Sequence, residues 1–303
     1  MAPYKSGYVA VVGRPNAGKS TLMNAFLGQK VAAVSPRPQT TRRRQLGILT
    51  LESAQIIFID TPGTHLPKHK LGVYMVSEAA AALHDADVIV FLVDASTPPE
   101  DNDRLLASQV TALSPHVPPV ILAINKVDLV DPAELPGRQV AYQALVPTAL
   151  PVAVSCLTGF QVDQLLAQIV QALPQGAPFY GEDQITDYYE RDIAGELVRE
   201  AALLHLRDEV PHCIAVRVDE YKERGETGAF VAATVFVERE SQKGIVIGQG
   251  GEMLKTIGAT ARREIEKMSG RKIYLELRVK VQKNWRNSED ALRLLGLARQ
   301  DEG

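Results

Sequence analysis

The sequence contains little cysteine, few aromatic residues and no long apolar run. Its two cysteines, Cys156 and Cys213, lack the paired spacing of zinc and redox motifs, so the expected compartment is reducing and cytoplasmic. The longest apolar run, Val88 to Val93, is far shorter than the roughly 20 residues that span a bilayer. The first residues do not combine a charged region, a long apolar stretch and a cleavage site, so no secretory signal is expected.

What the sequence does contain is typical of a globular protein with packed cores. Hydrophobic residues make up 46% and charged residues 23% of the chain, and the net charge is -3. A length of 303 residues predicts two domains, on the usual prior of about 150 residues each.

Charge is unevenly distributed along the chain. The segment from Ser241 to Arg286 has eleven lysine and arginine residues against four glutamates, which gives +7 and leaves -10 for the remainder. A basic module attached to an acidic one indicates a polyanionic partner for the basic part. A solvated helix face with charged strand edges would explain the same pattern, so charge alone leaves both interpretations open.

The first part of the chain alternates short apolar runs with helical patterns, and this alternation predicts a doubly wound, mostly parallel α/β sheet. The expected strands are Tyr8 to Val12, Gln45 to Thr50, Ala54 to Asp60, Val88 to Asp94, Val120 to Asn125 and Val152 to Ser155. The helices expected between them are Lys19 to Gly28, Gly72 to His84, Asp101 to Leu113, Pro132 to Leu145 and Gln161 to Leu173.

A segment rich in proline and glycine, Leu173 to Asp183, is typical of a linker. The predicted domains are therefore residues 1–173 and 186–303, with a linker at 174–185. The second domain is expected to contain a helix at Thr186 to Leu206, strands at Cys213 to Lys222 and Gly228 to Glu238, a helix pair, a strand at Lys272 to Lys283 and a short helix at Glu289 to Ala298.

The stretch GRPNAGKS fits the phosphate-loop pattern G-x-x-x-x-G-K-[ST] and stands between an expected strand and an expected helix. In such a loop, backbone N–H groups surround nucleotide phosphates at the positive end of the helix. Lys19 would reach the β- and γ-phosphates, and Ser20 would ligate Mg²⁺. The expected phosphate-binding residues are Gly13, Asn16, Ala17, Gly18, Lys19, Ser20 and Thr21.

The stretch NKVD, Asn125 to Asp128, indicates which base is bound. The Asp128 carboxylate can accept hydrogens from N1 and the 2-amino group of guanine, and a site built around a buried carboxylate rejects a base without those donors. Lys126 would lie along the base, and Asn125 would tie this loop to the phosphate loop. In SCLTG, which follows the last expected strand, a backbone N–H at Ser155 or Cys156 would face guanine O6.

Two further stretches predict the Mg²⁺ site and the elements that sense the γ-phosphate. In DTPG, Asp60 would hold Mg²⁺ and the Gly63 N–H would contact the γ-phosphate. In PQTTRRR, Thr41 is chosen over Thr40 as the threonine that ligates Mg²⁺. The metal ligands expected are therefore Ser20, Thr41 and Asp60. The arginines that follow Thr41 fit a solvated loop equally well.

These motifs, in this order and followed by the basic segment, resemble the ribosome-assembly GTPases, and most closely the Era family. The stretches GRPNAGKSTLMNAFLGQKVA, QTTRRR, DTPG and NKVD carry the likeness in the first half, and VERESQKGIVIGQGGEMLKTIG with LELRVKVQKNW carries it in the second. The resemblance implies a Ras-like GTPase domain followed by an α+β type II KH domain that binds RNA.

GQGG then fits the GXXG loop of a KH domain, which turns its backbone toward single-stranded RNA. The expected RNA-binding residues are Gly248, Gln249, Gly250, Gly251, Lys255 and Arg262. A Rossmann fingerprint is excluded, because Met253 stands where its last glycine is required. A plain turn between two helices would explain GXXG alone, and Trp285 fits either base stacking or a core position.

The resemblance further implies GTP hydrolysis with Mg²⁺, and binding near the 3′ end of small-subunit ribosomal RNA during assembly of the 30S subunit. Asn16 matches an asparagine that holds K⁺ in related GTPases. The expected state is a cytoplasmic monomer, and peripheral association with the inner face of the cell membrane is left open. Two departures from the family pattern are Cys156, where alanine is common, and Thr64, where Ras-like enzymes have the glutamine that positions water.

Two other functions stay open on the sequence. One is a GTPase of the same superfamily that acts on tRNA or carries paired GTPase domains, although the basic GXXG module argues against it. The other is an RNA-binding protein whose nucleotide site is only structural, and multiple-turnover GTP hydrolysis would exclude that function.

Overall fold

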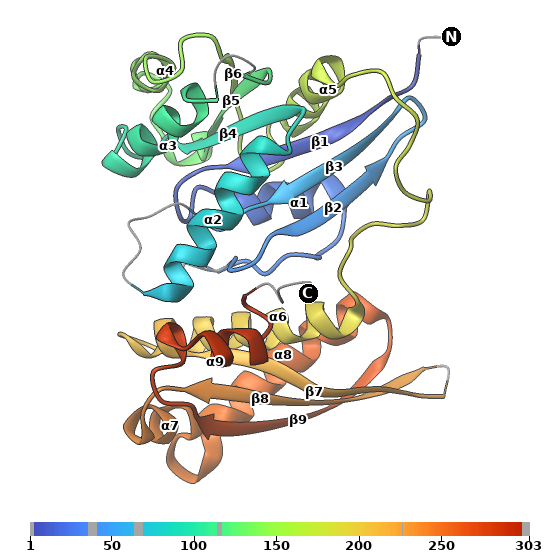
Figure 1. Ribbon diagram of the computed structural model, residues 1–303, viewed down its shortest axis with the longest axis vertical. Helices are drawn as coiled ribbons and strands as arrows, with labels where there is room; N and C mark the ends of the chain where they lie inside the picture. The colour runs from blue at the N-terminus through green and yellow to red at the C-terminus, as the bar shows by residue number, and fades with distance from the viewer. Residues whose placement is uncertain (1–2, 36–40, 64–68, 114–116, 226, 299–303) are drawn as a thin grey trace. The chain divides into compact units, whose positions relative to one another are not determined.

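The computed structural model describes residues 3–35, 41–63, 69–113, 117–225 and 227–298. The chain forms two compact units (Figure 1). Most described residues up to Asp187 belong to the first unit, and residues 30–35, 69–74 and those from Tyr188 onward belong to the second. Each unit has its own sheet, with six strands in the first and three in the second.

The first unit is built on a sheet with the strand order β2-β3-β1-β4-β5-β6. All neighbouring strands are parallel except β2 and β3, and the predicted doubly wound, mostly parallel sheet is thereby confirmed. The strands β3, β4 and β5 are buried at every position, and they are largely apolar because both of their faces are covered. The strands are β1 (Lys5–Val12), β2 (Gln45–Thr50), β3 (Ala54–Asp60), β4 (Val88–Asp94), β5 (Val120–Asn125) and β6 (Leu150–Ala153).

Helices follow the strands of this sheet in alternation. Side chains of α2, α3 and α4 pack with β1, β4 and β5 in one apolar cluster, and α1 contacts α5. The functional loops therefore leave the carboxyl ends of the parallel strands, which is where ligands bind in such sheets. The helices are α1 (Lys19–Leu27), α2 (Lys70–His84), α3 (Asp101–Thr111), α4 (Leu135–Gln143) and α5 (Val162–Ala172).

Two element boundaries in this unit differ from the sequence-based expectation. The strand β6 begins at Leu150, two residues earlier than expected, because Leu150 is paired with Ile121 of β5. The helix α4 begins at Leu135 and not at Pro132, because the residues after Asp131 form a turn in which the Glu134 N–H donates to the Asp131 carbonyl.

The segment predicted as a linker is hydrogen-bonded along the first unit. Its start is tied to β1 by the Ser6 N–H, which donates to the Pro174 carbonyl at 3.2 Å. Its end is tied to β2, where the Ile48 N–H donates to the Ile185 carbonyl at 2.8 Å. The helix predicted from Thr186 therefore begins only at Glu190, because the Thr186 hydroxyl donates to the Leu46 carbonyl at 2.7 Å and holds the chain extended there.

The second unit has the element order α-β-β-α-α-β of a type II KH domain and a short helix after it. In its sheet β7 is antiparallel to β8, and β8 is parallel to β9. Its elements are α6 (Glu190–His205), β7 (Ala215–Arg224), β8 (Gly228–Val237), α7 (Glu240–Ile247), α8 (Glu252–Ser269), β9 (Lys272–Val281) and α9 (Glu289–Leu294).

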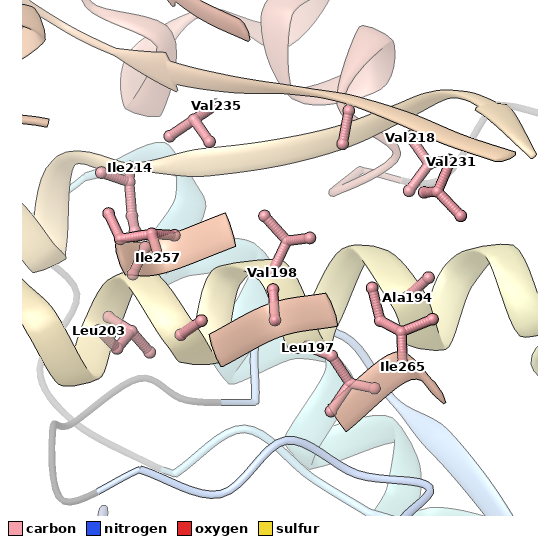
Figure 2. Close-up of a cluster of buried hydrophobic side chains, with 14 of the residues drawn as sticks. Ala194, Leu197, Val198, Leu203, Ile214, Val218, Val231, Val235, Ile257 and Ile265 are labelled. Carbon is pink, nitrogen blue, oxygen red and sulfur yellow. The ribbon is translucent and has the colours of Figure 1, made fainter. Parts of the chain in front are cut away.

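The core of the second unit lies between the sheet and the helices α6 and α8. Figure 2 shows its apolar side chains, with Leu197 and Val198 from α6, Val235 from β8 and Ile257 from α8. Trp285, for which the sequence left base stacking open, is fully buried, and its Nε1 donates to the Cys213 carbonyl at 2.9 Å. Trp285 therefore has the core role. Within the described residues, no helix has the length and apolar character needed to cross a membrane.

Candidate functional site

The phosphate loop joins β1 to α1 and folds tightly against the ends of β4 and β5. A Cβ atom on Gly13 would lie 2.3 Å from the Leu92 carbonyl oxygen, and one on Gly18 would lie 2.4 Å from Asn125 Nδ2. Gly18 also has a φ of 107°, which side chains strongly disfavour. Glycine is therefore required at both positions, and the loop that results directs backbone N–H groups to one point at the start of α1.

The predicted phosphate-binding residues all lie on this loop or in the first turn of α1. Lys19 is buried, and its Nζ donates to the carbonyls of Gly13 at 3.0 Å and Arg14 at 3.1 Å. Burial lowers the pKa of Lys19 to about 8, against an opposing effect from the Asp60 carboxylate. A buried ammonium group of this kind gains from an anionic ligand, because phosphate oxygens replace the water that it has lost.

The three predicted Mg²⁺ ligands lie together. The Ser20 hydroxyl donates to Asp60 Oδ2 at 2.8 Å, the Thr41 hydroxyl donates to the same oxygen at 3.0 Å, and the two hydroxyls are 3.0 Å apart. The other carboxylate oxygen, Oδ1 of Asp60, is buried and has no hydrogen-bond partner among the described atoms. Burial raises the pKa of Asp60, opposed by Lys19 and the two hydroxyls. Two hydroxyls around a buried carboxylate with a spare oxygen fit a hard divalent cation.

The strand β3 also brings the DTPG stretch against the phosphate loop. A Cβ atom on Gly63 would lie 2.8 Å from the Pro15 nitrogen, so this glycine permits a close approach of two backbone segments. The Thr61 hydroxyl donates to the Val11 carbonyl of β1 at 2.9 Å. Thr64, which stands at the position of the water-positioning glutamine, and Thr40, the alternative to Thr41, lie outside the described residues.

Asn125 connects its own loop after β5 with the phosphate loop and with the turn after β6. The sequence predicted the connection to the phosphate loop. Asn125 Nδ2 donates to the Ala17 carbonyl of the phosphate loop at 2.7 Å, and its Oδ1 accepts the Cys156 N–H at 2.9 Å. Cys156 is buried, and burial raises the pKa of its thiol to about 12. A guanine O6 would have to share the Cys156 N–H with Asn125.

Asp128 and Ser155 complete the predicted base-binding set. Ser155 is buried and its Oγ accepts the Thr158 N–H at 3.2 Å, which shapes the turn after β6. The Asp128 side chain is exposed, so the sequence-based picture of a buried carboxylate is wrong.

A charged network that the sequence analysis missed connects the phosphate loop with the base loop. Asp94, at the end of β4, accepts a hydrogen bond from Lys126 Nζ at 2.6 Å and lies 3.5 Å from Arg14. Burial alone would raise the pKa of Asp94, but hydrogen bonds from Lys126 and Ser96 hold it below its usual value. Lys126 has a φ of 65°, an uncommon conformation that this ion pair helps to maintain. The only sequence signal for this role of Asp94 is its position, as an acidic residue at the end of a buried apolar strand.

The GXXG turn lies between α7 and α8, as predicted. Gly248, Gly250 and Gly251 have φ values of 74°, 58° and 82°, so three of its four residues have positive φ values. A Cβ atom on Gly248 would lie 2.7 Å from the Met253 Cβ, whereas none on Gly250 or Gly251 would meet an atom within 4 Å. Gly248 is needed for packing, whereas Gln249 and Gly250 are exposed and Gly251 is half-buried, so the turn stays accessible to a ligand.

Three predicted RNA-binding residues, Gly251, Lys255 and Arg262, line one groove between α8 and β9. The groove has a volume of about 490 Å³. The sequence analysis missed Tyr274 and the apolar residues that form the floor of the groove. The helical spacing of apolar residues on α8 and the alternation of side chains on β9 are the sequence signals that point to them. The residues added are Leu254, Gly258, Ala259, Ile273, Tyr274, Leu275 and Leu277.

Comparison with known families matches each unit separately. Residues 8–126 match the family described as 50S ribosome-binding GTPase, and residues 209–286 match the KH domain family. The first match covers most of the six-stranded sheet, and the second covers the three-stranded sheet.

Two solved structures resemble the chain over its whole length. One is Era in complex with MgGDPNP and nucleotides 1506–1542 of 16S ribosomal RNA, with 42% identity, a TM-score of 0.92 and coverage of 98% of this chain and 100% of that one. The other is a variant of Era from Aquifex aeolicus bound to GDP and AlF₄⁻, with 41% identity, a TM-score of 0.92 and coverage of 97% and 100%. With this identity over the full length, the chain belongs to the Era family of GTPases, in which a KH domain follows the GTPase domain.

Proposed function

We propose that this GTPase is an RNA-binding switch protein that binds the 3′ region of small-subunit ribosomal RNA and assists assembly of the 30S subunit. One observation carries the proposal. A single chain combines the candidate guanine-nucleotide site with the GXXG groove. Over its full length the chain is similar to Era, whose structure was solved in complex with a GTP analogue and a fragment of 16S ribosomal RNA. We infer that it works as a cytoplasmic monomer, and peripheral membrane association stays a prediction.

In the nucleotide site, each group has a physical task. Backbone N–H groups of the phosphate loop and Lys19 would hold the β- and γ-phosphates, and the Gly63 N–H would sense the γ-phosphate. Ser20, Thr41 and Asp60 would hold Mg²⁺, which supplies positive charge to the phosphate oxygens during transfer to water. Asp128 would select guanine, while Asn125 keeps the base loop at a constant distance from the phosphate loop.

In the groove, RNA would be held mainly by its backbone and its base edges. The N–H groups of Gln249 to Gly251 face the sugar-phosphate chain at the positive end of α8, and Lys255 and Arg262 add charge. The apolar floor suits unstacked bases.

Two measurements test the proposal together. Phosphate release above one equivalent per protein, with GTP in excess, shows turnover and excludes a purely structural nucleotide site. Crosslinking in cells followed by sequencing of the bound RNA is expected to recover the 3′ end of small-subunit ribosomal RNA. Recovery of tRNA in its place would contradict the proposed substrate.

Asp94→Asn is expected to weaken GTP binding about tenfold, because the amide cannot replace the carboxylate that holds Lys126 and Arg14. Titration of a fluorescent GTP analogue measures the effect. Asp85→Asn is the matched control, since Asp85 forms an exposed ion pair with Arg44. An affinity equal to that of the unmodified protein would show that Asp94 does not position Lys126.

GTP hydrolysis is expected to be slow, and its rate is expected to be higher in K⁺ buffer than in Na⁺ buffer. Thr64 cannot position water as glutamine does, so charge stabilisation has to come from other groups. We expect Asn16, which lies on the phosphate loop, to hold a monovalent cation that supplies this charge. Turnover is compared in K⁺ and Na⁺ buffers of equal ionic strength, with Asn16→Ala as the variant that should lose the difference. Equal rates for the unmodified protein would remove the cation from the mechanism.

A further inference from the structure

The three-stranded sheet of the second unit has two different faces. The helices α6 and α8 cover one of them (Figure 1). On the other face, alternate residues of β9 point away from the core and are exposed, and they are Lys272, Tyr274, Arg278 and Lys280. This second face, called the outer face below, is assigned no role by the proposed function.

Three side chains from three strands stack across one end of the outer face. The Arg224 guanidinium on β7 lies 4.9 Å from the centre of the Phe230 ring on β8. The Phe230 ring is stacked on that of Tyr274 on β9, with centroids 5.7 Å apart and an interplanar angle of 20°. Tyr274 is 65% exposed, so the ring at the end of this stack has surface available for a further planar group.

The charge around the stack is positive. Lys222 is paired in register with Phe230, and Arg224 and Lys272 flank Gly228 on its two sides. Farther along the face, Glu276 binds Arg278 and Asp219 binds Arg217, while Glu220 is exposed. A planar aromatic and guanidinium stack with lysines beside it matches the chemistry of single-stranded nucleic acid, which offers flat bases and regularly spaced phosphates.

The stack is continuous with the groove through Tyr274. This residue belongs to the stack and also lines the groove beside Gly251 and Lys255. Because β9 is the edge strand of its sheet, Tyr274 lies at the border between the groove and the outer face.

We propose that the outer face is a second RNA contact, which takes the nucleotides that continue from the groove. One base stacks on Tyr274, and the following phosphates lie at Lys222, Arg224 and Lys272. This inference rests on the proposed binding of single-stranded RNA in the groove and extends it to a site that reads no sequence, since every base has a flat face.

The test compares two labelled single-stranded RNAs, one of about four nucleotides, which fills a KH groove, and one of about ten. The longer RNA is expected to bind the unmodified protein more tightly. Tyr274→Ala should weaken the longer RNA by about 5- to 100-fold and leave the short one nearly unchanged, whereas Tyr274→Phe should keep the full affinity. A 2-aminopurine scanned through the extension should be quenched at one position by the unmodified protein and by Tyr274→Phe, and not by Tyr274→Ala.

The matched control is Tyr189→Ala, which removes a tyrosine that is 78% exposed at the start of α6. It should leave both RNAs unaffected. Failure of the short RNA to bind the unmodified protein would reject the groove itself. If the short RNA binds but the longer RNA shows no added affinity and no quenching, only the outer-face proposal is overturned. A protein partner would then be the candidate ligand of the outer face.

Discussion

Replacing Gly250 and Gly251 together with aspartate is expected to reduce RNA binding by about 100-fold or more, while GTP affinity without RNA stays nearly unchanged. Two carboxylates at the exposed turn would face RNA phosphates, and like charges brought together cost several kcal/mol. The positive φ values of both glycines add backbone strain to the variant. Nucleotide affinity is preserved because all the proposed nucleotide ligands precede residue 160.

The same pair of positions provides the control for charge. Gly250→Asn with Gly251→Asn has similar size and strain without the carboxylates, so it should retain a substantial part of the RNA affinity. Fluorescence anisotropy measures binding, and circular dichroism verifies the fold. For the unmodified protein, log K should fall with log salt by about 0.7 for each single-strand phosphate neutralised. A folded aspartate variant that binds RNA as tightly as the unmodified protein would contradict the assignment of this turn.

Asp128→Asn is expected to weaken GTP binding by at least about 100-fold and to shift preference toward xanthosine triphosphate. The asparagine amide cannot accept both guanine hydrogens, whereas xanthine presents a carbonyl in place of the 2-amino group and can accept from that amide. Because Asp128 is exposed, the change should not disturb folding.

Competition between GTP and xanthosine triphosphate measures this shift in base preference. Asp163→Asn, in the first turn of α5, is the matched control and should leave both affinities as they are. Unchanged GTP affinity in Asp128→Asn would mean that another residue selects the base.

Local sequence patterns determined most of the fold and the chemistry of both loops. Apolar runs such as Val88 to Val93 predict strands buried on both faces, and the phosphate-loop pattern needs only its own glycines and Lys19 to be recognised. The glycines at 248, 250 and 251 likewise predict the turn, because positive φ values are a local requirement. Two of the boundaries that were wrong, the helix start at Thr186 and the strand start at Val152, depend on pairing with distant segments, whereas the helix start at Pro132 was displaced by a local turn.

Only the tertiary structure decided how separate loops act together. Asn125 contacts the phosphate loop and the Cys156 turn, and Asp94 joins Lys126 to Arg14, because parallel strands end at one edge of the sheet.

The segment after Leu173 has a linker composition, yet its backbone is bound to β1 and β2, a pairing that no local pattern encodes. The stack of Arg224, Phe230 and Tyr274 likewise exists only because strand register places three distant residues in line. Sequence determines what a segment can form by itself, whereas contacts between distant segments depend on the packing of the whole unit.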